Sequence, residues 1–151
     1  MSEKTSARAK PTDSPAPRRR RRATAAADGG TTPGAGIPAE LTLSAAVAHE
    51  KKATGVVTLD LRKVQAFTDF FFICTGQNAR QVKAIADAIE IALAKDGHKP
   101  AHVEGYDRAS WILLDYFTFI VHVVAPEARE FYDIERLWGS AERVDMPDPA
   151  A

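Results

Sequence analysis

Apolar residues recur at helical spacing in three segments of the chain. In the first segment, residues 42–52, Leu43 and Val47 lie one turn apart. This spacing predicts a short helix with Leu43 and Val47 on its buried side and Thr42 or Ser44 as its N-cap.

The second helical segment begins at Asn78 and ends at Gly97. Gln81 follows Asn78 by three residues, which is the pattern of an N-terminal capping box. The third segment begins at Pro126, a residue favoured in a first helical turn, and ends at Gly139. Its large apolar residues share one side and are expected to pack on a sheet: Phe131, Ile134, Leu137 and Trp138.

Five shorter segments have the pattern of β-strands. Residues 56–62 alternate in polarity, which predicts a strand with one buried face, whereas residues 70–75 are apolar throughout, as expected for a strand covered on both faces. Residues 102–104 form a short third candidate. Residues 111–115 and 119–124 are predicted to fold back on each other as an antiparallel hairpin.

The hairpin segment is apolar enough to raise the question of a membrane span. Residues 111–124, WILLDYFTFIVHVV, are interrupted only by Asp115, Thr118 and His122. A bilayer span needs about 18 consecutive apolar residues, so the segment is too short and carries a charge. We therefore expect buried sheet or a surface for a partner, and no membrane association.

Together these segments predict an α/β or α+β fold, in which helices cover one side of a mixed sheet of about five strands and the other side lacks a cover. The folded domain is expected to span residues 41–145. Residues 1–40 are rich in proline and alanine and lack aromatic residues, which predicts a disordered tail. Residues 146–151 are expected to be a short flexible C-terminus.

The net charge of zero is the sum of two opposite parts. Residues 1–40 contain eight Lys and Arg against four Asp and Glu, whereas residues 41–151 contain twelve against sixteen. The acidic domain favours a basic protein partner over a phosphate backbone. The tail contains an unbroken run that could contact RNA, nuclear import machinery or anionic membranes, or simply tether and solubilise the chain: Arg18, Arg19, Arg20, Arg21 and Arg22.

Targeting signals are weak. No apolar stretch of a secretory signal follows the basic cluster. The composition of residues 1–27 leaves a transit peptide open, although Glu3, Asp13 and the prolines interrupt an amphipathic helix. Bacterial cytoplasm is the simpler expectation, and the single cysteine, Cys74, agrees with a reducing compartment because no intramolecular disulfide can form.

Candidate catalytic and metal-binding residues lack the spacing that their chemistry needs. Cys74 and His122 lie in apolar strand segments and are expected to be core or interface residues rather than a nucleophile and its base. His98 and His102 have the offset of a helical metal pair, but Pro100 breaks the helix between them. The aspartates form no Asp-x-Asp pair that could hold magnesium. We expect no enzymatic activity, metal or cofactor.

Four motifs occur in order between about residues 42 and 143. They are TDFFFICTG at residues 68–76 with Arg80-Gln81-Val82; Glu104-Gly105; WILLDY at residues 111–116 with Val121-His122-Val123; and Arg129, Phe131-Tyr132 and Leu137-Trp138. Taken together, these motifs resemble the ribosomal silencing factor family, also called the Iojap family.

The resemblance implies a nucleotidyltransferase-like fold without transferase chemistry. It also implies binding to the large ribosomal subunit through its protein number fourteen, at the face where the small subunit docks, so that the subunits cannot join and translation is repressed. Organelle members of the family act in large-subunit assembly, which implies a possible role in biogenesis as well.

The partner-binding site is expected around the hairpin. Trp111, Leu113 and Asp115 alternate onto one strand face, and large aromatics flanked by carboxylates are typical of protein-binding hot spots. Trp111 as a core residue and Asp69 as a backbone-capping residue remain open alternatives. The residues expected to contact a basic partner are Asp69, Glu104, Trp111, Leu113, Asp115, Tyr116 and Phe117.

The hairpin tip departs from the family pattern. Phe117-Thr118 stand where the family commonly has Gly-Asp, so a glycine turn is lost and an aromatic side chain is gained. Two other functions stay open: a nucleotidyltransferase-like enzyme, and an RNA-binding module that uses the arginine run. An uncovered apolar sheet face would also favour a homodimer of the free protein.

Overall fold

The computed structural model describes residues 36–64 and 66–148. The predicted tail, with its arginine run, lies outside the described residues as far as residue 35, and so do residues 149–151 of the predicted C-terminal segment. The compact unit that begins at Pro38 contains the following elements in chain order: α3 (Ala39–Glu50), β2 (Thr54–Asp60), β3 (Phe70–Thr75), α4 (Ala79–Lys95), β4 (His102–Glu104), β5 (Trp111–Asp115), β6 (Phe119–Val124), α5 (Pro126–Tyr132), α6 (Ile134–Leu137) and β7 (Glu142–Asp145).

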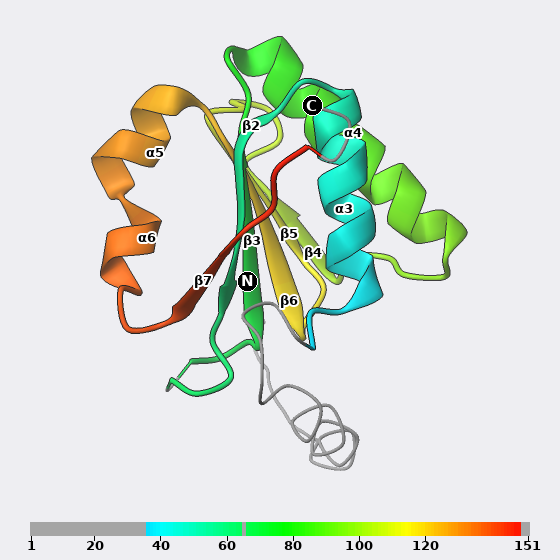
Figure 1. The fold of residues 1–151 in the computed structure, drawn as a ribbon. Coiled ribbons are helices and arrows are strands. Elements are labelled where there is room, and N and C mark those ends of the chain that lie inside the picture. Colours follow the sequence, from blue (N-terminus) through cyan, green and yellow to red (C-terminus); the bar gives the residue numbers. More distant parts are fainter. Residues whose placement is uncertain (1–35, 65, 149–151) are drawn as a thin grey trace, which may run out of the picture. The chain divides into compact units, whose positions relative to one another are not determined.

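These elements form a mixed sheet of six strands in the order β4-β5-β6-β3-β2-β7 (Figure 1). β3 and β6 pair in parallel at the centre, and the other neighbours are antiparallel. The predicted α/β class and mixed sheet are confirmed. The prediction of about five strands missed β7.

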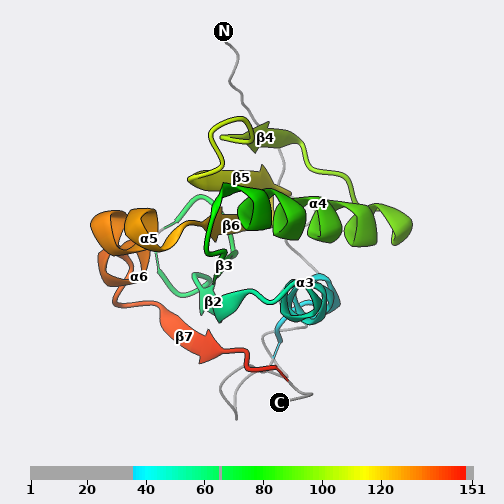
Figure 2. The ribbon, with the colours of Figure 1, turned by 90° about the horizontal axis from the view of Figure 1, so that it is seen from above.

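Helices lie on both sides of this sheet (Figure 2). α3 and α4 pack against each other, α3 contacts β2, and α4 contacts β5 and β6; we call the side that they cover the helix face. α5 and α6 lie on the opposite side, which we call the open face because they cover only part of it. We call residues 126–137, which form α5 and α6, the arm. The expected one-sided cover is therefore wrong in part, because the arm covers some of the second face.

The predicted capping of α4 is confirmed. The side chain of Asn78 accepts a hydrogen bond from the backbone N–H of Gln81 at 2.9 Å. The side chain of Gln81 accepts one from the backbone N–H of Gln77 at 2.6 Å, so the two polar side chains satisfy amides at the helix start. The buried residues recur every three or four positions, as the apolar pattern predicts: Val82, Ile85, Ala86, Ile89 and Leu93.

The start and buried side of α3 differ from the prediction. The helix begins at Ala39 after Pro38, without a side-chain cap, and the Ser44 hydroxyl instead donates to the Glu40 carbonyl oxygen at 2.8 Å. Leu43 and Val47 are only half-buried. The buried side packs on α4 and consists of Leu41 and three small residues: Ser44, Ala45 and Ala48.

β2 is buried on both faces rather than one. Val57 and Leu59 face the open side, where they join a cluster with Phe71 and Ile134. Thr58, on the other face, is fully buried, and its hydroxyl donates to the sulfur of Met146 at 2.9 Å. The single-face prediction fails because α3 and the chain after β7 cover the face on which Thr58 lies, although the polarity of that face suggested solvent.

The single closing helix predicted for residues 126–139 is broken at Asp133. This residue has a left-handed backbone, with φ of 47°, and separates α5 from α6. The break changes the direction of the helical positions that follow. Ile134 is buried, but Phe131 is 80% exposed and Leu137 is 77% exposed, so the prediction that they pack on the sheet is wrong.

β7 extends the sheet at its edge beside β2. Its sequence, ERVD, has one apolar residue, as is common for an edge strand, and it therefore gave no strand signal. Contacts continue beyond the predicted domain end: the Met146 N–H donates to the Val56 carbonyl oxygen at 2.9 Å, and the imidazole Nε2 of His49 lies 2.7 Å from the Met146 carbonyl oxygen.

The β5–β6 hairpin turns through Phe117 with an unfavourable backbone. The N–H of Tyr116 donates to the Phe119 carbonyl oxygen, and the N–H of Thr118 donates to the Tyr116 carbonyl oxygen at 2.8 Å. Phe117, between them, has φ of 72°, a conformation that side chains with a Cβ rarely adopt. The side chain of Thr68 donates to the Phe117 carbonyl oxygen at 2.8 Å and helps to hold the turn.

Replacing Phe117 by glycine should therefore stabilise the fold. We expect Phe117→Gly to raise the free energy of unfolding by about 1 kcal/mol in urea denaturation, because the gain from relieving the left-handed backbone exceeds the added freedom of the unfolded chain. Thr118→Gly is the matched control, since Thr118 has no positive φ, and it should lower stability by roughly 0.5–1 kcal/mol. Equal destabilisation by both changes would contradict the assignment of strain to Phe117.

Candidate functional site: a protein-binding face of the sheet

Strand register brings most of the predicted contact residues onto the open face. Glu104 pairs with Leu113, and Leu113 pairs with His122, so these side chains form one row across three strands. Trp111 and Asp115 lie on the same face of β5 as Leu113, and all three are half-buried while Ile112 and Leu114 between them are buried. The predicted alternation along β5 is confirmed.

Trp111 is held on this face by a buried histidine. The indole Nε1–H of Trp111 donates to Nδ1 of His122 at 3.0 Å. The His122 ring also lies 4.6 Å from the ring of Phe71 in an edge-to-face arrangement. Trp111 is therefore partly core and partly surface, with its orientation set by one hydrogen bond.

Burial determines the protonation state of His122. The imidazole is 4% exposed, and this desolvation lowers its pKa from 6.5 to about 4. Because Nδ1 accepts from Trp111, the neutral ring carries its proton on Nε2, which is buried and has no hydrogen-bond partner among the described residues. The neutral ring is thus the form that the native structure holds.

Two carboxylates mark the turn end of the open face. Oδ1 of Asp115 accepts a hydrogen bond from the Phe117 N–H at 2.8 Å, so this side chain shapes the turn in addition to presenting charge. Asp69 lies beside the same turn, because its backbone N–H donates to the Thr118 carbonyl oxygen at 3.0 Å. Phe117 itself is 70% exposed at the tip.

Tyr116 does not belong to the exposed set. It is 8% exposed, and its ring stacks on Phe119 at 4.8 Å between centroids. Burial raises the pKa of its hydroxyl to about 12, and the hydroxyl oxygen has no hydrogen-bond partner among the described residues. Alternation along β5 places Tyr116 on the helix face, opposite Trp111, and this explains why it is not presented at the tip as the sequence suggested.

The arm adds aromatic residues that were not predicted as part of the site. The Tyr132 ring lies 4.8 Å from the ring of Trp111, and Phe131 lies 4.9 Å from Tyr132. Tyr132 is 52% exposed. Helical periodicity alone placed Phe131 in the core, but Phe131 is exposed in the structure, and Tyr132 lies against Trp111 of β5.

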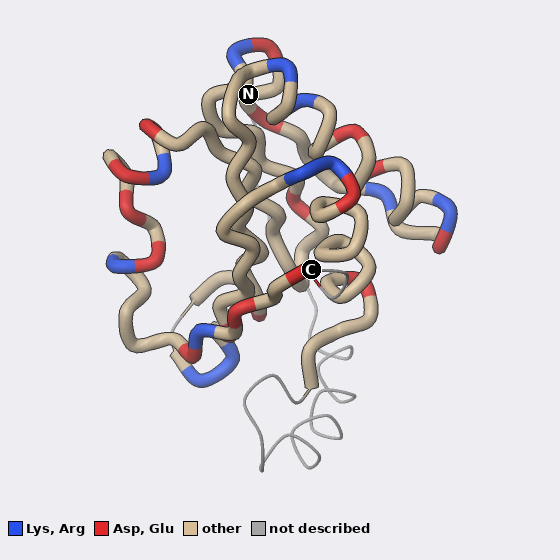
Figure 3. Tube along the Cα trace, turned by 45° about the horizontal axis from the view of Figure 1, so that its top comes forward, with Lys and Arg blue, Asp and Glu red and all other residues tan. Residues whose placement is uncertain are grey.

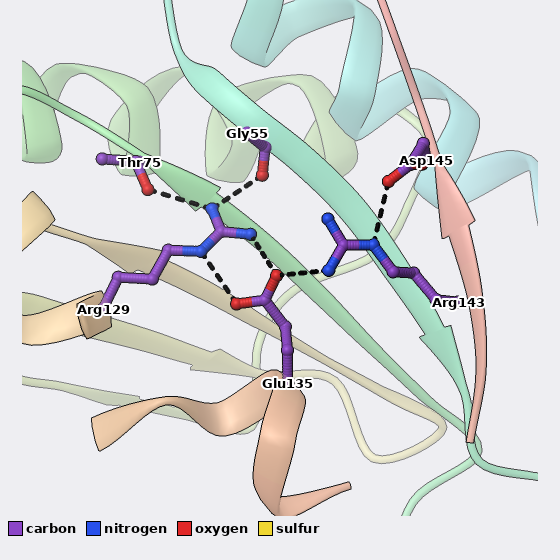
Figure 4. Close-up of polar contacts among 6 residues, drawn as sticks. All are labelled: Gly55, Thr75, Arg129, Glu135, Arg143 and Asp145. Carbon is purple, nitrogen blue, oxygen red and sulfur yellow. Dashed lines mark hydrogen bonds and ion pairs between the residues drawn. The ribbon is translucent and has the colours of Figure 1, made fainter. Parts of the chain in front are cut away.

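An arginine fastens the arm to the sheet (Figure 4). Nη1 of Arg129 donates to the Gly55 carbonyl oxygen at 2.7 Å and to the Thr75 hydroxyl at 3.0 Å. Nε and Nη2 of Arg129 donate to the two carboxylate oxygens of Glu135 at 3.0 and 2.7 Å, in a bidentate pair. Arg143 donates to the same carboxylate at 3.0 Å, and the hydrogen bonds from Arg129 lower the pKa of Glu135.

Glycine at position 55 makes this contact possible. Its φ is 56°, and a Cβ there would lie 2.8 Å from Nη1 of Arg129. A similar restriction holds at Gly105, where a Cβ would collide with the carbonyl oxygen of Trp111. The two glycines allow close backbone approach at opposite sides of the candidate site.

The cysteine and histidine that were considered as a nucleophile and its base lie on opposite faces of the sheet. Cys74 pairs with Val123 and points to the helix face, whereas His122 points to the open face, so the sheet separates the thiol from the imidazole. Burial also raises the pKa of Cys74 to about 12. The described residues contain no group of three His, Cys, Asp or Glu side chains that could hold a metal ion. None of the described helices is long and apolar enough to cross a bilayer.

Half-exposed aromatic rings and carboxylates on a partly covered sheet define a small α/β protein whose site suits binding of another protein. The family model described as "Ribosomal silencing factor during starvation" matches residues 35–151. The chain belongs to this ribosomal silencing factor family.

Individual relatives agree with this membership. The chain is 36% identical over 106 residues to the Ribosomal silencing factor RsfS of Halalkalibacterium halodurans, covering 70% of this chain and 91% of that protein. It is 35% identical over 106 residues to the protein of the same name from Bacillus subtilis, covering 70% and 90%. A crystal structure from Bacillus halodurans superimposes with a TM-score of 0.62 at 34% identity and covers 72% of this chain and 100% of that one.

The buried imidazole should make stability depend on pH. Since the pKa of His122 is lowered from 6.5 to about 4 in the fold, the unfolded chain binds the proton more tightly between these values. The free energy of unfolding should therefore be highest above pH 6.5 and should decrease progressively as the pH falls to 4. His122 accounts for up to about 3 kcal/mol of this decrease. Urea denaturation at several pH values measures this loss.

One variant separates His122 from other titrating groups. His122→Phe should flatten the pH dependence in this window, because it removes the buried imidazole. Parallel pH profiles for His122→Phe and the parent would overturn the assignment.

Proposed function

We propose that the protein binds the large ribosomal subunit through the open face of its sheet and keeps the small subunit from joining. The observation that carries this proposal is the half-buried Trp111, which is oriented by His122 and lies on the same sheet face as Asp115 and Glu104. Interfaces concentrate their binding energy in such partly packed aromatic anchors. Membership of a family named for ribosomal silencing supports the large subunit as the partner.

The chemistry of the face favours a basic protein as the direct partner. Asp69, Glu104 and Asp115 add negative charge to the sheet region that contains Trp111, which would attract and orient a positively charged surface and repel RNA phosphates. The family resemblance gives ribosomal protein number fourteen as that partner, at the face where the small subunit docks. Occupying this face would prevent subunit joining by steric exclusion and so repress translation.

The proposed action needs no bond-making chemistry, cofactor or metal. It would take place in the cytoplasm, where ribosomal subunits meet, and a role in large-subunit biogenesis is compatible with the same binding site. In the free protein, self-association through the uncovered face would hide the same aromatic residues.

Substitution of Trp111 tests the binding face. Trp111→Ala should weaken co-sedimentation with purified large subunits by about 2 kcal/mol, or roughly thirtyfold in Kd, and should restore joining of the two subunits in sucrose gradients. Ile91→Ala is a matched control, because Ile91 is a 58% exposed apolar residue on α4, on the other side of the sheet. Unchanged binding by folded Trp111→Ala protein would reject the face, and unimpeded subunit joining by excess parent protein would reject the silencing role.

Removal of residues 1–35 separates this proposal from binding by the arginine run. α3 begins at Ala39, so the truncation leaves the described domain intact. We expect most large-subunit binding to survive the truncation. Any affinity that is lost should be the part that decreases as the salt concentration rises. Complete loss of binding on truncation would favour the RNA-binding alternative.

A further inference from the structure

The arm continues the aromatic surface of the proposed binding face. Tyr132 lies 4.8 Å from Trp111 between ring centroids and remains 52% exposed, and Phe131 lies 4.9 Å from Tyr132 and is 80% exposed. The rings therefore form one uninterrupted series from β5 to the outer surface of α5. A partner seated on Trp111 would meet Tyr132 next.

The position of Tyr132 is set by contacts one helical turn earlier. Arg129 and Tyr132 are three residues apart on α5, so they lie on the same side of that helix. Arg129 donates to the hydroxyl of Thr75, and strand register places Thr75 opposite Val124, which in turn is opposite Trp111. The arginine thus anchors α5 in the row of the sheet in which Trp111 lies.

We call the hydrogen bonds of Arg129 to Gly55, Thr75 and Glu135, with that of Arg143 to Glu135, the clamp. The clamp also joins the two halves of the arm across the break at Asp133. Its carboxylate partner, Glu135, comes from α6, and Arg143 of β7 holds the same carboxylate from the other side. The side chains of Arg129 and Glu135 are only 16% and 18% exposed, so solvent weakens their pairing less than at an exposed surface. α6 has four residues, of which only Ile134 is buried, so without the pairing of Arg129 and Glu135 it would have few contacts to hold it in place.

The charge of the arm suits a basic partner. Acidic positions predominate along α5 and α6 (Figure 3). Because Glu135 is engaged by Arg129 and Arg143, the carboxylates outside the clamp are Glu127, Glu130 and Asp133, against Arg136 alone. The arm therefore adds negative charge to that of the predicted contact residues Asp69, Glu104 and Asp115.

We propose that the arm is a second part of the partner-binding surface, in which Tyr132 contacts the same basic protein surface as Trp111 and Arg129 acts as the residue that positions Tyr132. This inference rests on the proposed function and adds to it residues of a different element. Arg129 does not itself touch the partner; it acts through the ring that it places beside Trp111.

A double-mutant cycle on the full chain tests this arrangement. Binding to purified large subunits is measured for the parent, Tyr132→Ala, Arg129→Gln and the double variant. Tyr132→Ala should raise the Kd about tenfold. Arg129→Gln should raise it by a similar factor in the parent but have little further effect in the Tyr132→Ala background, because the ring through which it acts is gone.

A purely structural role for Arg129 gives a different pattern. In that case Arg129→Gln would weaken binding by the same factor in both backgrounds, and the positioning role would be overturned. Thr75→Val removes only the hydroxyl that accepts from Arg129, so it repeats the cycle with a milder change if Arg129→Gln does not fold by circular dichroism. Arg136→Gln removes an arm arginine outside the clamp and should leave the affinity unchanged or slightly higher.

Trp111→Ala, measured in the same series, separates failure of this inference from failure of the proposed function. Weaker binding by Trp111→Ala with parent-like binding by Tyr132→Ala would overturn the arm as a contact surface and leave the sheet face in place. Parent-like binding by both variants would overturn the face and the arm together.

Discussion

Parallel pairing between β3 and β6 is the constraint on which the other elements depend. Every residue of both strands is buried, so neither strand could occupy a sheet edge without exposing a run of apolar side chains. A parallel pair requires a long connection, and here α4 crosses one face before the chain returns through β4 and β5. That path leaves the face of β5 bearing Trp111 on the side that α4 does not cover.

Much of the fold could be predicted from sequence because its strongest signals are local. The apolar run of β3 and the Asn78 cap each depend on neighbouring residues, and both are observed. The missed features depend on contacts between distant segments. β7 has only Val144 as an apolar residue and is a strand because β2 offers it a free edge, and the left-handed backbone at Asp133 is held by a clamp whose members come from five elements.

The candidate site shows the same division. Alternation along β5 was sufficient to put Trp111 and Asp115 on one face, and pairing of β4 with β5 adds Glu104 to it. Alternation also places Tyr116 on the other face. How deeply the hairpin tip packs depends on contacts between distant segments, and so the ring of Tyr116 was expected at the surface. Tyr132 could not be assigned to the binding site, because its contact with Trp111 of β5 depends on how the arm packs on the sheet. Local periodicity predicted the arm as part of one continuous helix.

The thiol of Cys74 has a practical consequence for following this protein. It lies in β3, is fully buried, and has a pKa raised to about 12, so neither water-borne oxidants nor alkylating reagents can reach a thiolate there. Modification of this sulfur would require β3 to separate from its neighbours. The rate at which a thiol reagent labels the native chain would thus report how often the centre of the sheet opens, without any added probe.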